Sequence, residues 1–105
     1  MVDMIYFKKH KTENGAIIAM CDSELIDKVL QEGVIELNIK DYSSFYKGEL
    51  ISEAEAKGQI DPKEIYSANV VGSKSVEIAM KSSIIEKGHV KTIKSVPYAQ
   101  AFKVK

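Results

Sequence analysis

The stretch Ser67 to Met80, with the sequence SANVVGSKSVEIAM, constrains the fold of this chain more than any other feature. Its first half is apolar and rich in β-branched residues, which is typical of a short buried strand. Gly72 interrupts this run, and apolar residues then recur at helical spacing at Val76, Ala79 and Met80. The stretch therefore predicts a buried strand that leads through a glycine turn into an amphipathic helix.

The start of this helix is a candidate anion-binding site. Unpaired backbone N–H groups and the positive end of the helix dipole favour an anion there. The candidate binding residues are Asn69, Gly72, Ser73, Lys74 and Ser75. They also fit a structural interpretation, in which Gly72 lets the chain turn and Ser73 or Ser75 caps the helix. We favour the structural interpretation, because a helix N-terminus needs a cap whether or not it binds a ligand.

The N-terminal part of the chain predicts an antiparallel hairpin. Residues 4–7 and 16–21 are apolar, and the Asn14-Gly15 pair lies between them. Asn-Gly is the pair that a type I′ turn prefers, because both of its central residues need positive φ angles. The second strand lacks alternation of polar and apolar residues, so we expect both of its faces to be covered.

A helix is predicted directly after this hairpin. Asp22 is suited to cap it, the apolar residues between Leu25 and Leu30 would form its core face, and Gly33 would end it in a left-handed conformation. Apolar and polar residues then alternate over residues 34–39, which predicts another strand.

The second half adds shorter elements. Ser52 with Glu55 forms a capping box, which predicts a short helix to about residue 57. Strands are expected over residues 90–93 and 98–104, with Pro97 as an interruption. Helices and strands are interspersed, and the first pairing is antiparallel. We therefore expect an α+β fold with one domain over residues 1–105, built as a two-layer sandwich with a mostly antiparallel sheet and two main helices.

Composition limits the classes of function. No run of 18 apolar residues exists, so no membrane span is expected, and the N-terminus lacks a signal-peptide pattern. These features predict a cytoplasmic protein. Net charge is zero, but the last 19 residues carry five lysines and no acidic residue. This segment predicts a basic face if it lies against the cluster formed by residues 8–11, and otherwise a set of solvated lysines.

Catalytic and metal-binding patterns are weak. Cys21 is the single cysteine, and its place before a predicted helix could lower its pKa and make it nucleophilic. No local signature pairs it with His10 or His89, so a buried structural role is favoured. Cys21, His10 and His89 do not have the spacing of metal ligands. Residues 72–75 lack the upstream glycine and the Gly-Lys-Ser order of a phosphate-binding loop. We therefore expect no catalytic residue, no metal and no cofactor.

Three groups of residues are candidates for RNA contacts. Phe45, Tyr46 and Lys47 lie in a turn-rich aromatic segment that could stack on unpaired bases, although three close aromatics fit a core position better. Pro97 and Tyr98, with Gln100, could line a groove. The basic segment adds further candidates for phosphate contacts, and these are Lys87, Lys91 and Lys94.

Several segments of the chain resemble a known family. They are CDSEL at residues 21–25, FYKGEL at 45–50, ANVVG followed by SVEIA within 68–79, and VPYAQ at 96–100. In this order they resemble an uncharacterised family of small archaeal proteins, the domain of unknown function family number 424. Asp27 and Tyr98 depart from the family pattern, which tends to have glycine and histidine there. The second departure puts a catalytic or metal role at that position in doubt.

The resemblance covers nearly the whole chain and implies a small α+β sandwich without an assigned reaction, associated with translation or RNA. Together with the basic and aromatic residues, it leads us to expect a non-catalytic RNA- or ribonucleoprotein-binding accessory module. Alternatives are an accessory protein that binds a protein partner through the aromatic loop, and a small enzyme that uses Cys21.

Overall fold

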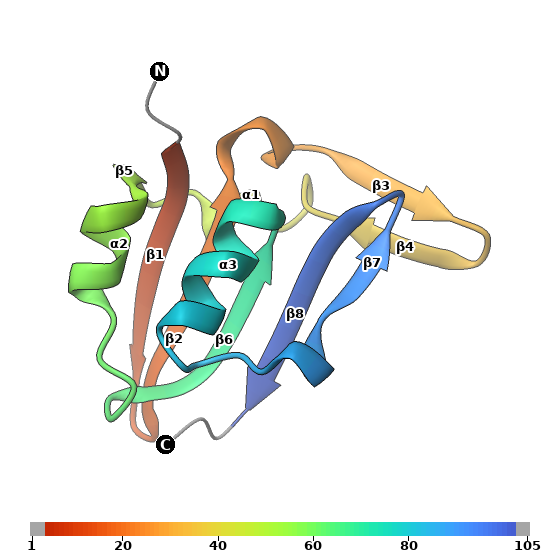
Figure 1. Ribbon diagram of the computed structural model, residues 1–105. Coiled ribbons are helices and arrows are strands. Elements are labelled where there is room, and N and C mark those ends of the chain that lie inside the picture. The colour runs from red at the N-terminus through yellow and green to blue at the C-terminus, as the bar shows by residue number, and fades with distance from the viewer. Residues whose placement is uncertain (1–3, 103–105) are drawn as a thin grey trace.

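A six-stranded sheet forms the centre of the molecule in the computed structural model, which describes residues 4–102 (Figure 1). In spatial order its strands are β5 (Glu49–Ser52), β1 (Met4–Thr12), β2 (Gly15–Asp22), β6 (Ile65–Val71), β8 (Val96–Phe102) and β7 (Lys91–Ile93). All neighbouring pairs are antiparallel except β2 and β6, which are parallel. The predicted α+β fold, with a mostly antiparallel sheet and an N-terminal hairpin, is confirmed.

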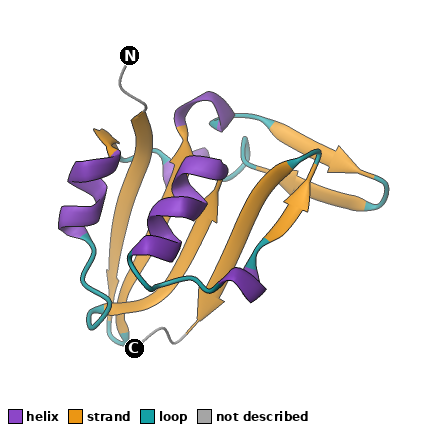
Figure 2. Cartoon of the chain, viewed as in Figure 1, coloured by secondary structure: helices purple, strands orange, loops and turns teal. Residues whose placement is uncertain are grey.

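The two faces of the sheet carry different elements (Figure 2). One face is covered by the two long helices, α2 (Glu53–Gln59) and α3 (Ser73–Lys81). The other face carries the short helix α1 (Ser43–Tyr46) and a separate two-stranded hairpin of β3 (Val29–Glu32) and β4 (Ile35–Asn38). We call this hairpin the arm, because it extends past the edge of the main sheet. Single 3-10 turns occur at Ser23–Leu25 and Lys87–His89.

The stretch around Gly72 folds as predicted, with small differences. Residues 65–71 form β6, Gly72 has a φ of +106°, and α3 follows directly. Val76, Ile78 and Ala79 are buried on the inner side of α3, whereas Met80, which the spacing had placed on that side, is exposed. The apolar stripe of α3 is therefore displaced toward Ile78.

The predicted helix after β2 is wrong. Only one 3-10 turn forms at residues 23–25, and residues 29–32 form strand β3 instead. Gly33 does have a positive φ of +62°, but it lies in the turn between β3 and β4 rather than at a helix end. Leu30 and Leu37 lie opposite each other in the arm and pack on the sheet, so tertiary packing overrides the local helical spacing.

The turn types also differ from the prediction. The hairpin of β1 and β2 forms, but neither Glu13 nor Asn14 has a positive φ, and Gly15 takes it instead at +134°. A Cβ at Gly15 would lie 3.0 Å from the Glu64 carbonyl oxygen, so the close approach of that loop favours glycine. The two successive positive φ angles of a type I′ turn occur at Lys94 and Ser95, between β7 and β8.

Other local predictions are confirmed. Ser52 and Glu55 form both bonds of the capping box at the start of α2. Residues 91–93 form a strand, but Pro97 lies inside β8 rather than interrupting it. The Pro97 carbonyl accepts the Gly72 N–H at 2.8 Å, so the missing N–H of Pro97 faces the end of β6, where the Gly72 carbonyl already accepts the Val76 N–H. Residues 103 and 104 of the predicted last strand lie outside the described residues.

Candidate functional site

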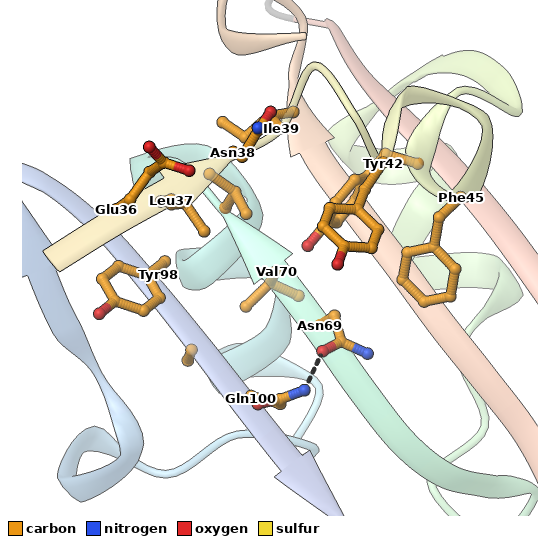
Figure 3. Close-up of a pocket in the computed structure, with 13 residues that line it drawn as sticks. Glu36, Leu37, Asn38, Ile39, Tyr42, Phe45, Asn69, Val70, Tyr98 and Gln100 are labelled. Atoms are coloured by element: carbon orange, nitrogen blue, oxygen red, sulfur yellow. Dashed lines mark hydrogen bonds between the residues drawn. The ribbon is translucent and has the colours of Figure 1, made fainter. Parts of the chain in front are cut away.

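A groove opens on the face of the sheet that carries the arm and α1 (Figure 3). Its volume is about 630 Å³. Three parts of the chain line it: β4 and the residue after it, the segment around α1, and the middle of strands β6 and β8. The lining residues are Glu36, Leu37, Asn38, Ile39, Tyr42, Phe45, Tyr46, Asn69, Val70, Val71, Tyr98, Ala99 and Gln100.

Five of the residues predicted from sequence meet in this groove, namely Phe45, Tyr46, Asn69, Tyr98 and Gln100. They come from three elements that are far apart in the sequence. Asn69 and Tyr98 lie on neighbouring strands of the sheet. Phe45 and Tyr46 belong to α1, which packs on the face of the sheet that also carries the arm. The fold thus joins the predicted aromatic segment with the predicted groove residue Tyr98.

Two amide side chains lie side by side in the groove. Asn69 and Gln100 are directly opposite each other in the β6–β8 pair, so they point to the same face. The Gln100 Nε2–H group donates a hydrogen bond of 2.7 Å to Asn69 Oδ1 (Figure 3). This bond uses one donor and one acceptor, so the pair keeps further donor and acceptor capacity for a ligand.

Aromatic rings border the groove on two sides. Tyr98 and Tyr42 lie on opposite sides of it (Figure 3), and Tyr42 is 63% exposed. Phe45 is stacked on His10, with ring centroids 4.6 Å apart and an interplanar angle of 8°. The His10 Nε2–H group also donates a hydrogen bond of 3.0 Å to the Phe45 carbonyl. His10 therefore holds the Phe45 ring at the rim of the groove.

Tyr46 and Cys21 belong to the packed part beneath the groove. Both side chains are buried, together with Ala19, Ile39 and Val71. Burial raises the pKa of the Tyr46 hydroxyl to about 12. Burial and the nearby carboxylates, chiefly that of Asp22, raise the pKa of the Cys21 thiol to about 12. The thiol is therefore protonated at neutral pH, which argues against a nucleophilic role.

The predicted anion site at the start of α3 receives a carboxylate from the protein itself. Asp22 Oδ2 accepts the backbone N–H of Lys74 at 3.1 Å, and Oδ1 accepts that of Ser75 at 2.8 Å. The Ser75 hydroxyl donates to Oδ1 at 2.9 Å. Neither Ser73 nor Ser75 caps the helix with its own oxygen, and a Cβ at Gly72 would lie only 2.2 Å from Asp22 Cγ. An external anion would have to displace this carboxylate.

The remaining predicted residues lie outside the groove. Lys47 is exposed after α1, and Pro97 points to the opposite face from Tyr98 because successive strand residues alternate. Lys87, Lys91 and Lys94 lie at or near the β7 edge of the sheet. Strands β2, β6 and β8 separate this edge from β1, so these lysines do not form one basic face with residues 8–11. Lys91 is the direct cross-strand neighbour of Tyr98.

Gln100 was predicted to line a groove with Tyr98, and both residues do, because residues two positions apart in a strand share one face. Other groove residues were missed. Tyr42 belongs to the same aromatic segment as Phe45. Strand β4 was predicted over residues 34–39, but its place beside the groove could not be found, because its partner β3 was predicted as a helix.

The described residues give no support for a metal centre or a membrane span. Within residues 4–102, no group of three His, Cys, Asp or Glu side chains is placed to hold a metal ion. None of the helices in this range is long and apolar enough to cross a membrane.

Comparisons with known proteins give one family and one fold. The model of the family described as "Protein of unknown function (DUF424)" matches residues 10–104. No curated protein matches the chain. An uncharacterised conserved protein from Methanopyrus kandleri, solved by crystallography, is similar to this chain with a TM-score of 0.78. The identity is 18%, and the alignment covers 95% of this chain and 91% of the other, so the likeness extends to the fold alone.

Proposed function

This chain belongs to the DUF424 family of proteins of unknown function, and we propose that it is a non-catalytic module that binds single-stranded RNA, free or within a ribonucleoprotein. We infer that it works in the cytoplasm as an accessory to an archaeal translation apparatus. The observation that carries the RNA proposal is the groove, in which one exposed and two half-buried aromatic rings border a pair of amide side chains on an open sheet face.

The aromatic rings supply the stacking part of this proposal. Unpaired bases stack on tyrosine and phenylalanine side chains, and such contacts contribute about 1–3 kcal/mol per base. Tyr98 and Tyr42 border the groove from opposite sides, and the stack on His10 fixes Phe45. An unstacked base bound between these rings would exchange water for aromatic surface without any need for a particular sequence.

The amide pair supplies the hydrogen-bonding part. Asn69 and Gln100 offer N–H donors and carbonyl acceptors at neighbouring points of the sheet. The edge of every nucleobase also combines donors and acceptors. The amide pair is therefore suited to pair with a base edge while the base stacks on Tyr98.

The charges near the groove are sparse, which limits how tightly the module would bind RNA by itself. Lys91 lies beside Tyr98 and Lys94 lies in the following turn, so both are placed for phosphate contacts at that end of the groove. The chain has zero net charge, and few phosphate contacts mean weak binding at physiological salt. We therefore propose that a protein partner helps to hold the module on its RNA.

The arm favours protein binding as a second candidate function. Val34 at its tip is fully exposed, and Val29 and Ile35 are about half exposed. Apolar side chains on a projecting hairpin are suited to bind a protein surface. A partner bound there would leave the groove free for RNA.

Fluorescence anisotropy with a labelled eight-nucleotide single-stranded RNA tests the leading proposal. We expect binding at 50 mM salt that Tyr98→Ala weakens about tenfold, because one stacking contact is lost. Tyr6→Ala is the matched control, since Tyr6 is half-buried on β1 and lies outside the groove. Failure of the wild-type protein to bind at 50 mM salt, or equal losses in both variants, would overturn the proposal. Recovery from cell extract of one protein partner that survives RNase would favour the second candidate.

A further inference from the structure

A second hollow lies at the closed end of the β1–β2 hairpin, and three of its lining residues are lysines. We call it the lysine pocket. Its volume is about 530 Å³, and Lys9, Lys11, Thr12, Gly15, Ala16, Lys63 and Glu64 line it. None of these residues takes part in the groove.

The basic cluster of β1 is divided between the two faces of the sheet. Successive residues of a strand point to opposite sides. Lys8 and His10 point to the face of the groove, where Lys8 Nζ donates to the Ser44 carbonyl at 2.8 Å. Lys9 and Lys11 point to the other face and line the lysine pocket. The sequence cluster therefore serves two separate sites.

The loop before β6 brings the third lysine to this pocket. Lys63 belongs to a turn in which the Glu64 N–H donates to the Asp61 carbonyl at 2.9 Å. The Glu64 carbonyl in turn accepts the Ala16 N–H at 2.8 Å, which ties the turn to β2. The absence of a Cβ at Gly15 allows this close approach. The backbone of the hairpin thus fixes Lys63 beside the two lysines of β1.

The charge of the pocket is unbalanced. Lys9 Nζ pairs with Glu64 Oε2 at 3.2 Å, which leaves Lys11 and Lys63. Among residues 4–102, no carboxylate lies within ion-pair distance of either of them. The pocket therefore holds two uncompensated positive charges around a hollow large enough for a phosphate group.

We propose that the lysine pocket binds phosphate groups, supplied either by a small phosphorylated molecule or by the backbone of a nucleic acid. Lysine acts here as a point charge rather than a bidentate fork, so the pocket is suited to phosphate charge and not to one fixed geometry. If RNA is the source, this inference rests on the proposed function. The strand would then pass around β1 from the base in the groove to the lysines on the other face.

Isothermal titration calorimetry with pyrophosphate at 20 mM salt tests the pocket without any base. Lys11→Met and Lys63→Met keep the length of the side chain but remove its charge. We expect each to weaken pyrophosphate binding about fivefold, and the double variant to abolish it. Lys28→Met is the control, because this exposed lysine is outside the pocket. An equal loss in Lys28→Met would overturn the proposal, since it would reflect overall charge alone.

Single-stranded RNA measured between 20 and 200 mM salt identifies the source of the phosphate. Each phosphate contact contributes about 0.7 to the slope of log affinity against log salt. Between 20 and 200 mM salt, the RNA affinity of each pocket variant should therefore fall by a factor about five times smaller than that of the wild type. An unchanged slope, together with no pyrophosphate binding, would overturn the proposal. Pyrophosphate binding without RNA binding would support the pocket and contradict the proposed function. RNA binding that only Tyr98→Ala weakens, with no binding of pyrophosphate, would support the proposed function and contradict the pocket.

Discussion

The two faces of the central sheet are built in different ways. On the helix-covered face, α2 and α3 pack on a continuous hydrophobic cluster that includes Ile5, Ile18, Met20 and Val70. On the arm-covered face the buried cluster is smaller and includes a thiol and a phenol, from Cys21 and Tyr46. The helices close the first face, whereas the arm and α1 leave a groove on the second. We infer that the first face maintains the fold and the second is available for binding.

The largest expected effect is a difference between the two faces in the free energy of unfolding that is lost when a side chain is truncated. Ile78→Ala on α3 empties a fully buried position, so we expect it to lower the free energy of unfolding by about 3–4 kcal/mol. Leu37→Ala on the arm removes a half-buried side chain beside the groove and should cost about 1 kcal/mol. Urea unfolding measures both. Equal losses would contradict the difference between the two faces.

A smaller effect is expected at alkaline pH, and it concerns the arm-covered face alone. The folded protein raises the pKa of the Cys21 thiol from 9.0 to about 12, so the unfolded chain releases this proton first. This group has no effect on stability below pH 9, and between pH 9 and 11 it lowers the free energy of unfolding by up to about 1.4 kcal/mol per pH unit, which amounts to about 2–3 kcal/mol. Tyr46 adds a similar loss from pH 10.

Cys21→Ala isolates the contribution of the thiol. The variant is expected to be less stable at pH 7, because it loses a packed sulfur atom, but to lose less stability between pH 9 and 11 than the wild type does. Urea unfolding at each pH measures this difference. Parallel pH profiles for the two proteins would show that the thiol does not titrate differently on folding.

The smallest effect concerns the attachment of the arm. Glu32 Oε1 accepts the backbone N–H of Lys94 at 2.6 Å, which joins the tip of the arm to the β7–β8 turn. Without this bond the arm should open more often, and its Leu30 and Leu37 pack against the buried cluster that contains Cys21. We expect Glu32→Ala to speed labelling of Cys21 by a thiol reagent about fivefold, with little change in global stability.

Two variants control this measurement. Glu32→Gln keeps an oxygen that can accept the same hydrogen bond, so its labelling rate should stay near that of the wild type. Gln31→Ala, on the same strand, removes an exposed side chain and should have no effect. Since the chain has one cysteine, the labelling signal has a single source. A faster rate in all three variants would indicate that any change in the arm exposes Cys21.

The sequence predicted the helix-covered face better than the arm-covered face, for a physical reason. The β6–α3 stretch and the capping box of Ser52 and Glu55 are local patterns, in which near neighbours along the chain determine the element. The arm depends on contacts between Leu30, Leu37 and a sheet that local spacing cannot reveal. The alternation in β4 predicted a strand correctly, whereas the helical spacing in β3 predicted the wrong element.

The groove shows the same limit. Tyr98, Phe45 and Asn69 could be named from residue type, but their meeting required the order of strands in the sheet. The two-residue period of β8 places Gln100 on the same face as Tyr98, and Gln100 was predicted there. The carboxylate that accepts the N–H groups at the start of α3 was not predicted, because Asp22 was suited equally well to cap the residues that follow it in sequence.

The bond between Asp22 and Ser75 has a consequence for how the chain folds. The two residues are 53 positions apart, and the bond requires β2 and β6 to lie side by side in their parallel register. Helix α3 therefore cannot receive its cap until a long stretch of chain has been closed, which costs conformational entropy and slows folding. Nucleation of the helix and pairing of the central strands become one event. We expect the helix-covered core to form in a single cooperative step that a fragment ending before residue 73 could not complete.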